Sequence, residues 1–229
     1  NEGFAKGNNR GLKISTGRYK LLLNPDTKVS PDTFQIMMDF MKARPDVGIS
    51  TCKLIKGDGS LDLASRRSLP DPWNSLMRVT GLSFLFPKSK KIAAYNLTNT
   101  DENQEMEIGS CVGAFMFVSP SCYEQIGLLD EQFFMYGEDI DWCKTAQEKG
   151  FKIWYYPKTT TIHYKGSSSR KNTKKALYEF HNVMWKYYRK HLAKIYPAPL
   201  NWLVYVGIWS RYVLQLIKNI LRKEAFVSK

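Results

Sequence analysis

Cysteine is scarce in this sequence and is never paired. Only four cysteines occur in 229 residues, none of them in a CxxC motif. This excludes a paired-cysteine zinc site and a disulfide framework. Single cysteines among apolar residues are typical of small core side chains in a reducing compartment. We therefore expect four buried thiols, at Cys52, Cys111, Cys122 and Cys143.

Acidic residues are almost missing from the C-terminal part. From 165 to 229 the sequence has 14 Lys and Arg against Glu179 and Glu224, a net charge of +12 out of +13 for the whole chain. Residues 1–164 are therefore nearly neutral. A cationic, aromatic-rich tail suits an anionic partner: a phospholipid surface, a lipid-linked phosphate or nucleic acid. A solvated basic surface without a partner is the alternative.

Long uninterrupted apolar runs are also lacking. The nearest is 200–221, which Arg211 interrupts and Asn201, Ser210 and Gln215 dilute. Its length is barely enough for a bilayer. We favour a helix lying in the plane of a membrane interface, over a helix packed on protein and over a true span. No N-terminal signal pattern is present.

What is present is an alternation of short apolar runs and amphipathic segments, which indicates an α/β fold. Strands are expected at 19–23, 47–55, 109–118, 153–156 and 160–164, and helices from about 30, 119, 138 and 174. The first run fits a buried parallel strand and ends in Asn24-Pro25-Asp26. Ligands gather at the carboxyl ends of strands in such sheets, so Asp26 is a candidate ligand for Mg²⁺ or Mn²⁺. A plain Asx-Pro turn explains it equally well.

The chain is organised around the stretch 133–151. It places three carboxylates, Glu138, Asp139 and Asp141, behind Gly137 and among aromatic residues that include Trp142. Acids in a first helical turn are commonly capping residues. The alternative is that Asp139 is a positioned catalytic base.

Three further features remain ambiguous on the residues alone. The Arg66-Arg67 pair suits a diphosphate, although an exposed basic loop is commoner. His163 ends a predicted strand, where a histidine is more often structural than a ligand. Asn8 and Asn9 lie in a glycine-spaced loop that allows close approach to a sugar or phosphate.

Five segments in this order resemble the family 2 glycosyltransferases, in particular the bacterial rhamnosyltransferase-like enzymes of cell-surface polysaccharide synthesis. They are GFAKGNNRG, LLLNPDT, GAFMFV, LLDEQFFMYGEDIDWC and YYPKTTTIHYKGSSS. The resemblance implies a GT-A fold, a mostly parallel sheet sandwiched by helices. It divides the chain into a partial GT-A domain, 1–169, and a basic helical membrane-associating appendage, 170–229. The family's first strands should precede Asn1, so we expect part of the donor site to be missing and this fragment to be inactive alone.

The resemblance also implies roles for single residues. Asp139 matches the catalytic base, and Asp26 and His163 match the residues that hold the metal ion, with Asn24 in place of the first acid. Asn8, Asn9, Asn24, Gly113 and Ala114 match segments that contact the donor. Glu138, Asp141, Trp142 and Arg66 are assigned to the acceptor or to an auxiliary role.

The implied activity is that of a metal-dependent, inverting hexosyltransferase. It would move a sugar, rhamnose by preference, from dTDP-rhamnose or a UDP-sugar to a lipid-linked glycan or polysaccharide. The implied location is peripheral, at the cytoplasmic face of the inner membrane, with residues 170–229 on the membrane surface and no nucleic-acid partner. The alternatives are a non-catalytic basic module that binds membrane or nucleic acid, and a metal-dependent nucleotidyltransferase.

Overall fold

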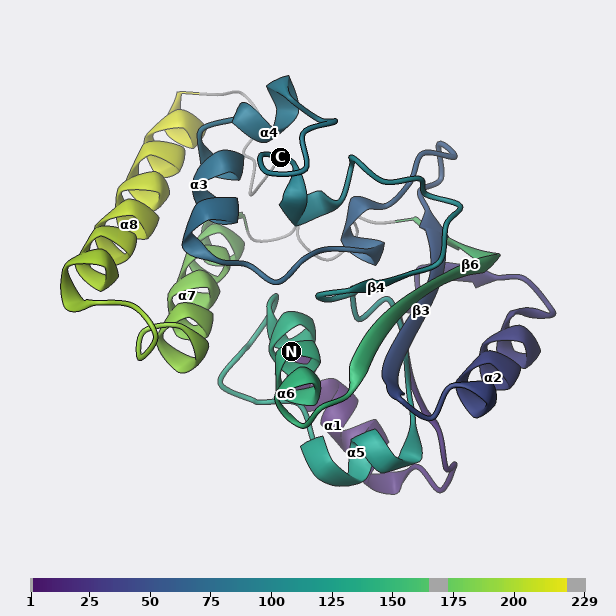
Figure 1. Cartoon of the computed structure of the whole chain (residues 1–229). Helices are drawn as coiled ribbons and strands as arrows, with labels where there is room; N and C mark the ends of the chain where they lie inside the picture. The colour runs from purple at the N-terminus through teal and green to yellow at the C-terminus, as the bar shows by residue number, and fades with distance from the viewer. Residues whose placement is uncertain (1, 165–172, 222–229) are drawn as a thin grey trace. The chain divides into compact units, whose positions relative to one another are not determined.

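A computed structural model describes residues 2–164 and 173–221 (Figure 1). These residues form two compact units. The larger comprises 8–129 and 139–164, and the smaller comprises 2–7, 130–138 and 173–221. The expected boundary at 169/170 lies outside the described residues.

The larger unit is built on a six-stranded sheet with the order β1-β5-β3-β6-β2, in which β4 also pairs with β6. Its longest pairing is the parallel one between β3 (Val47–Ile55) and β6 (Lys152–His163). The flanking strands run antiparallel to their neighbours: β1 (Lys20–Leu23) along β5 (Phe115–Val118), β5 along β3, and β2 (Thr27–Val29) and β4 (Met106–Ile108) along β6. The α/β class is confirmed, but the expectation that 19–23 forms a parallel strand is wrong.

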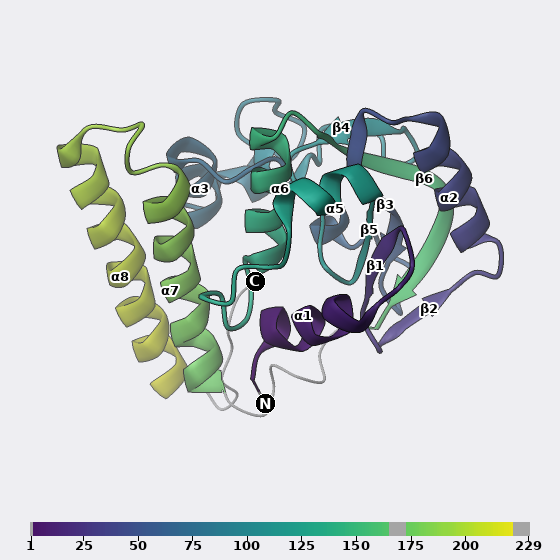
Figure 2. The same ribbon diagram turned by 90° about the horizontal axis from the view of Figure 1, so that it is seen from below.

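Helices cover both faces of this sheet (Figures 1 and 2). On one face lies α2 (Thr33–Ala43), which buries Met37, Phe40 and Met41 against β3 and β5. Phe34, in the first turn of the same helix, is exposed. On the other face lie α5 (Pro120–Ile126) and α6 (Glu138–Glu148). Ser119 caps α5 by accepting a hydrogen bond from the Cys122 backbone N–H at 3.3 Å, as the Ser-Pro sequence predicts.

Two strand predictions need correction. The segments 153–156 and 160–164 form one strand, β6, which passes through Pro157 with a register shift against β3 between Thr51 and Lys53. Proline has no N–H to donate to the ladder, so the strand continues only with this irregularity. The predicted strand 109–118 is shorter, because regular pairing begins at Phe115.

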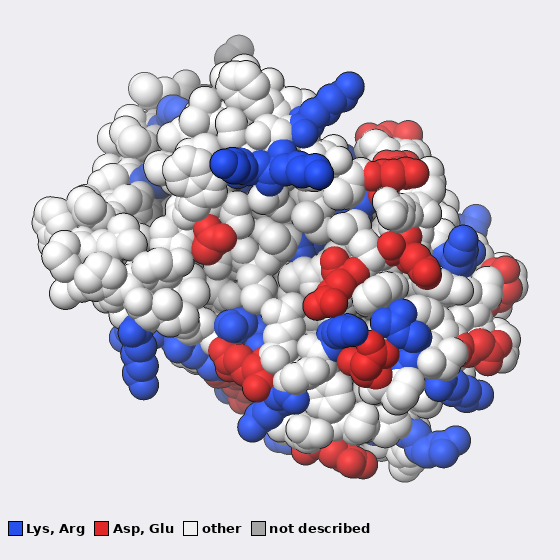
Figure 3. Space-filling view, viewed as in Figure 1, with Lys and Arg blue, Asp and Glu red and all other residues white. Residues whose placement is uncertain are grey.

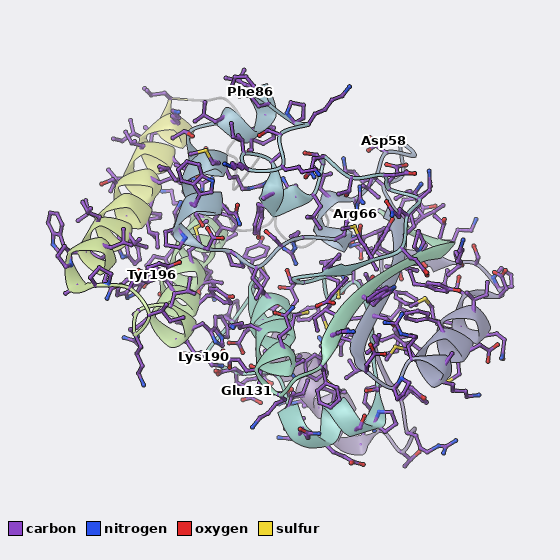
Figure 4. All side chains as sticks on the ribbon, in the orientation of Figure 1. Asp58, Arg66, Phe86, Glu131, Lys190 and Tyr196 are labelled. Atoms are coloured by element: carbon purple, nitrogen blue, oxygen red, sulfur yellow. The ribbon has the colours of Figure 1, made fainter. Side chains whose placement is uncertain are left out.

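The connection between β3 and β4 contains η1 (Leu63–Ser65), α3 (Pro72–Val79), α4 (Leu82–Leu85) and η2 (Ala94–Asn96). Asp71 caps α3 through the Asn74 backbone N–H at 2.7 Å. Three apolar residues of this connection are more than half exposed: Phe84, Leu85 and Phe86. Figure 4 shows Phe86 at the outer edge of this connection.

The smaller unit contains the beginning of α1 (Phe4–Ile14) and the antiparallel pair α7 (Thr173–His191) and α8 (Ala198–Ile220) (Figures 1 and 2). Aromatic contacts join the pair, including Trp185 with Tyr205 at 5.0 Å between ring centroids. The loop 130–138 belongs to the same unit: Lys190 binds Asp130 at 2.7 Å, and Tyr136 packs edge-on against Phe180 of α7. Within 2–164 and 173–221, no helix combines the length and the hydropathy that a membrane span requires.

Candidate functional site

The first component of the site is a turn at the end of β1. Asn24 donates its backbone N–H to the Ala114 carbonyl at 3.0 Å, and Thr27 closes the turn through its N–H and hydroxyl, which both reach the Asn24 carbonyl. The Asn24 side chain points instead to His163, with Nδ2 3.4 Å from Nε2. An Asx turn would use this side chain on the local backbone. The turn therefore leaves the side chains of Asn24 and Asp26 available to the end of β6.

His163 is the last residue of β6 and is only 4% exposed. Its Nε2 lies 3.4 Å from Asp26 Oδ1, and its Nδ1 lies 3.0 Å from Asp62 Oδ2. A carboxylate oxygen can only accept a hydrogen bond, so the ring donates from Nδ1 to Asp62 and turns Nε2 toward Asp26. The predicted neighbours Asp26 and His163 are thus together, and Asp62 joins them.

The residues fit a divalent cation that is bound partly by substrate. Two cis ligands of an octahedral Mg²⁺ ion stand about 3 Å apart, close to the 3.4 Å between Asp26 Oδ1 and His163 Nε2. Asp62 occupies the opposite ring nitrogen, as carboxylates behind metal-binding histidines do. Among the described residues, no group of three or more His, Cys, Asp or Glu is arranged to hold a metal ion. Asp26 and His163 would supply two ligands, and phosphate oxygens and water would supply the others.

The second component is Asp139 at the start of α6. It follows Tyr136 and Gly137, which both have positive φ, 71° and 78°. Its Oδ1 accepts the Ile140 backbone N–H at 2.8 Å, and its Oδ2 lies 2.9 Å from Arg67 Nη2. Both side chains of this ion pair are mostly buried, 9% exposed for Asp139 and 13% for Arg67. Asp139 therefore has a fixed orientation in a site largely shielded from water.

The ion pair with Asp139 changes the pKa of Arg67. Burial alone would lower its pKa, but the charge of Asp139 and the hydrogen bond to it outweigh that cost and leave the pKa of the guanidinium raised. Arg67 therefore remains charged beside the proposed base.

The other candidates on α6 are buried. Glu138 and Asp141 are 6% and 2% exposed. Trp142 is 1% exposed, donates its indole N–H to the Gly127 carbonyl at 3.1 Å and packs edge-on against Tyr123. These contacts give Trp142 a place in the core under α5.

The donor-contacting candidates lie on α1 and before β5. The side chain of Asn9 binds the backbone of Leu129 twice, as donor to its carbonyl and as acceptor from its N–H, both at 2.9 Å. Asn8 is partly exposed on the same helix, and Gly113 and Ala114 are buried just before β5. Only Asn24 among the donor candidates contacts the histidine.

Arg66 and Arg67 have different environments. Arg66 is 2% exposed, donates to the Thr100 hydroxyl and the Asp101 carbonyl, and lies over the Tyr155 ring. Figure 4 shows it inside the larger unit. Its contacts hold the loop 100–101, whereas Arg67 contacts the proposed base.

The sequence analysis did not identify Asp62, and it identified Arg67 only as one of an arginine pair that would hold a diphosphate. They lie in an irregular segment without strand or helix periodicity, and their partners are 101 and 72 residues away. The two adjacent arginines were the only available signal, and the diphosphate interpretation did not anticipate a carboxylate partner.

The sheet with helices on both faces, an acid after β1 and an acid at the start of α6 define an α/β protein of the GT-A type. A solved structure of similar fold is that of GalNAc-T7 with UDP, GalNAc and Mn²⁺, which matches 92% of this chain and 42% of that chain, with a TM-score of 0.51 and 10% identity. At this identity the likeness concerns the fold alone.

The family follows from the sequence match. The model of the family described as glycosyltransferase-like family 2 matches residues 1–181. This chain belongs to that family.

Curated relatives have modest identity. The N-acetylglucosaminyl-diphospho-decaprenol L-rhamnosyltransferase of Mycobacterium tuberculosis is 25% identical over 90% of this chain and 66% of its own length. The low-salt glycan biosynthesis hexosyltransferase Agl10 of Haloferax volcanii is 28% identical over 71% of this chain and 49% of its own. The rhamnosyltransferase WbbL of Escherichia coli K12 is 26% identical over 76% and 65%. The chain thus spans between half and two thirds of the length of these relatives.

Proposed function

We propose that this chain carries the acceptor-activating part of an inverting glycosyltransferase. It moves a hexose, rhamnose by preference, from a nucleoside-diphosphate sugar to a hydroxyl of a lipid-linked glycan or polysaccharide. The observation that carries the proposal is Asp139, a mostly buried carboxylate oriented by Arg67 and by the Ile140 N–H. Family membership and the names of the rhamnosyltransferase relatives support the reaction class.

Proton transfer is the step assigned to Asp139. Each carboxylate oxygen has two lone-pair sites, and the contacts with Arg67 and Ile140 occupy one site on each oxygen. A remaining site accepts the acceptor's hydroxyl proton as its oxygen bonds to the anomeric carbon and the bond from that carbon to the diphosphate breaks. General-base catalysis of this kind contributes about 10²- to 10⁴-fold. Attack from the face opposite the leaving group inverts the anomeric centre.

Asp26 and His163 are the residues that would hold Mg²⁺ or Mn²⁺, with Asp62 behind the histidine. When bound, the cation supplies Lewis-acid stabilisation of the leaving diphosphate.

The test is a donor screen with the full-length protein, comparing wild type with Asp139→Asn. We expect release of a nucleoside diphosphate and at least about a 10²-fold loss of kcat in the variant, with donor binding retained. Asp58→Asn is the matched control, because Asp58 lies at the outer tip of the turn after β3 (Figure 4). Unchanged turnover in Asp139→Asn would refute the base role, and release of pyrophosphate would indicate a nucleotidyltransferase.

We also propose that residues 170–229 bind the cytoplasmic face of the inner membrane peripherally. The support is a row of exposed apolar side chains along α8, at helical spacing: Leu203, Val206, Val213, Leu214, Ile217 and Leu221. Figure 3 shows the surface over α8 as mostly uncharged. Basic residues such as Arg189, Lys190 and Lys218 end the two helices. An apolar face with basic flanks favours anionic lipid.

Co-sedimentation with vesicles tests the membrane proposal. We expect wild type to bind phosphatidylglycerol vesicles better than phosphatidylcholine vesicles, with binding reduced by salt. Leu214→Gln/Ile217→Gln should lose most of this binding. Val79→Gln, which changes an exposed apolar residue of α3, should not. Equal binding by wild type and the α8 variant would contradict the proposal.

A further inference from the structure

We infer that the segment 62–67 positions both halves of the proposed site, with Asp62 holding His163 at one end and Arg67 holding Asp139 at the other. The inference rests on the proposed function. It concerns two residues that act through their partners and do not themselves touch the substrate, so both are positioning residues.

Asp62 is held by contacts with His163, Ala64 and Ser65. Its Oδ2 lies 3.0 Å from His163 Nδ1, and its Oδ1 accepts the Ala64 backbone N–H at 3.0 Å. Its carbonyl accepts both the N–H and the hydroxyl of Ser65, at 2.9 and 2.7 Å. Asp62 and His163 are 1% and 4% exposed. The ring is therefore held in one orientation, which directs Nε2 toward Asp26.

Arg67 is fixed through both its backbone and its side chain. Its N–H donates to the Ser110 carbonyl at 2.9 Å, and its own carbonyl accepts the N–H groups of Gly109 and Ser110 at 2.8 and 2.9 Å. Its Nη2 donates to Asp139 Oδ2 at 2.9 Å and to the Cys111 carbonyl at 3.2 Å. A guanidinium held this way is a fixed donor for the carboxylate.

The segment between these ends is short and anchored. Five residues of extended chain span at most roughly 18 Å, and the 3₁₀ turn Leu63–Ser65 shortens this distance. Arg66, directly before Arg67, is held by the Thr100 hydroxyl and the Asp101 carbonyl. The position of the histidine and that of the base are therefore defined by one rigid stretch of backbone. A displacement of about 1 Å in a reacting group is enough to lower turnover by about 10²-fold.

The Asp62 end is tested by Mn²⁺ binding, which does not depend on activity. Free Mn²⁺ is measured by electron paramagnetic resonance while the full-length protein is titrated with Mn²⁺ in the presence of UDP. We expect Asp62→Asn, and Asp62→Ser as a second variant, to bind Mn²⁺ about 10- to 100-fold more weakly, as for other carboxylates behind a metal-binding histidine. Asp58→Asn is the matched control, and circular dichroism verifies folding.

Asp26→Asn separates this inference from the proposed metal site. If Asp26→Asn weakens Mn²⁺ binding and both Asp62 variants bind as wild type does, the role of Asp62 is refuted and the metal site stands. If Asp26→Asn binds Mn²⁺ as wild type does, the proposed metal site itself is refuted.

The Arg67 end is tested by kinetics in two backgrounds. We expect Arg67→Met to lower kcat about 10- to 100-fold with the donor KM changed only a few-fold, and Arg67→Lys to recover part of the loss. In the Asp139→Asn background, Arg67→Met should have no further effect, because its contribution passes through the carboxylate. An equal loss in both backgrounds would refute positioning by Arg67. Full activity of Asp139→Asn would instead refute the proposed base.

Discussion

The ion pair between Arg67 and Asp139 has a consequence for stability that does not depend on any substrate. Arg67→Met removes the cation and leaves the Asp139 carboxylate mostly buried, 9% exposed, without its charged partner. Breaking a buried pair on one side costs about 3–5 kcal/mol. Because both side chains keep some contact with water, we expect the lower limit, about 3 kcal/mol. For a chain of this size, that corresponds to a melting temperature lower by about 6–12 °C.

The assay is a double-mutant cycle measured by urea unfolding. The proteins are wild type, Arg67→Met, Asp139→Asn and the double variant, followed by tryptophan fluorescence, since Trp142 and Trp154 both lie in the larger unit. Removing the charge from Asp139 relieves the cost of removing Arg67. We therefore expect the double variant to be more stable than the sum of the single changes by about 1.5–3 kcal/mol.

The control is an ion pair on the same helix with more solvent contact. Lys144 lies 3.4 Å from Glu148 in α6, and Glu148 is 47% exposed. Lys144→Met should cost no more than about 0.5 kcal/mol. A cost below about 1 kcal/mol for Arg67→Met, with additive behaviour in the cycle, would mean that the buried ion pair does not form and that Arg67 does not orient the base.

Three further outcomes are expected. In differential scanning calorimetry, Gly137→Ala should lower the melting temperature more than Gly150→Ala does. Both glycines have a positive φ, but a Cβ at 137 would clash with Val183, whereas a Cβ at 150 meets open space. Asn9→Ala should lower stability by about 2–4 kcal/mol in urea unfolding, because it leaves the N–H and carbonyl of Leu129 without the side chain that binds both; a cost near zero would contradict the clamp. Burial raises the pKa of Cys52 and of Cys122 to about 12, so iodoacetamide at pH 8 should label these thiols only after unfolding. Their contribution to the stability of the folded protein, present below about pH 9, should be lost as the pH rises toward 12. Rapid labelling of the native protein would contradict this.

Several local features of the fold were predictable from the sequence. The apolar run 47–55, the Ser119-Pro120 helix start and the glycine after α6 each depend on a few neighbouring residues, and each forms where the sequence indicates. Burial of the four cysteines was predictable for the same reason, because apolar flanks place a small side chain in a core. The turn that carries Asp26 and the helix start that carries Asp139 are also local.

Pairings between distant residues were not predictable from these patterns. The periodicity of apolar residues predicts which face of a strand is buried, but it does not predict the direction of the neighbouring strand. The antiparallel pairing of β1 with β5 is therefore known only from the structure. The helix α7, assigned from its charge to a separate appendage, packs in one unit with the loop 130–138 that leads to Asp139.

By itself, the sequence determined which side chains have suitable chemistry: a carboxylate after a strand, a histidine at a strand end and a carboxylate at a helix start. Only the tertiary structure decided their partners. Asp62 is 101 residues from His163, and Arg67 is 72 residues from Asp139. Contacts at such separations follow from how the sheet and the irregular β3–β4 connection pack together, and a segment without periodicity carries no local signal of what its side chains will meet.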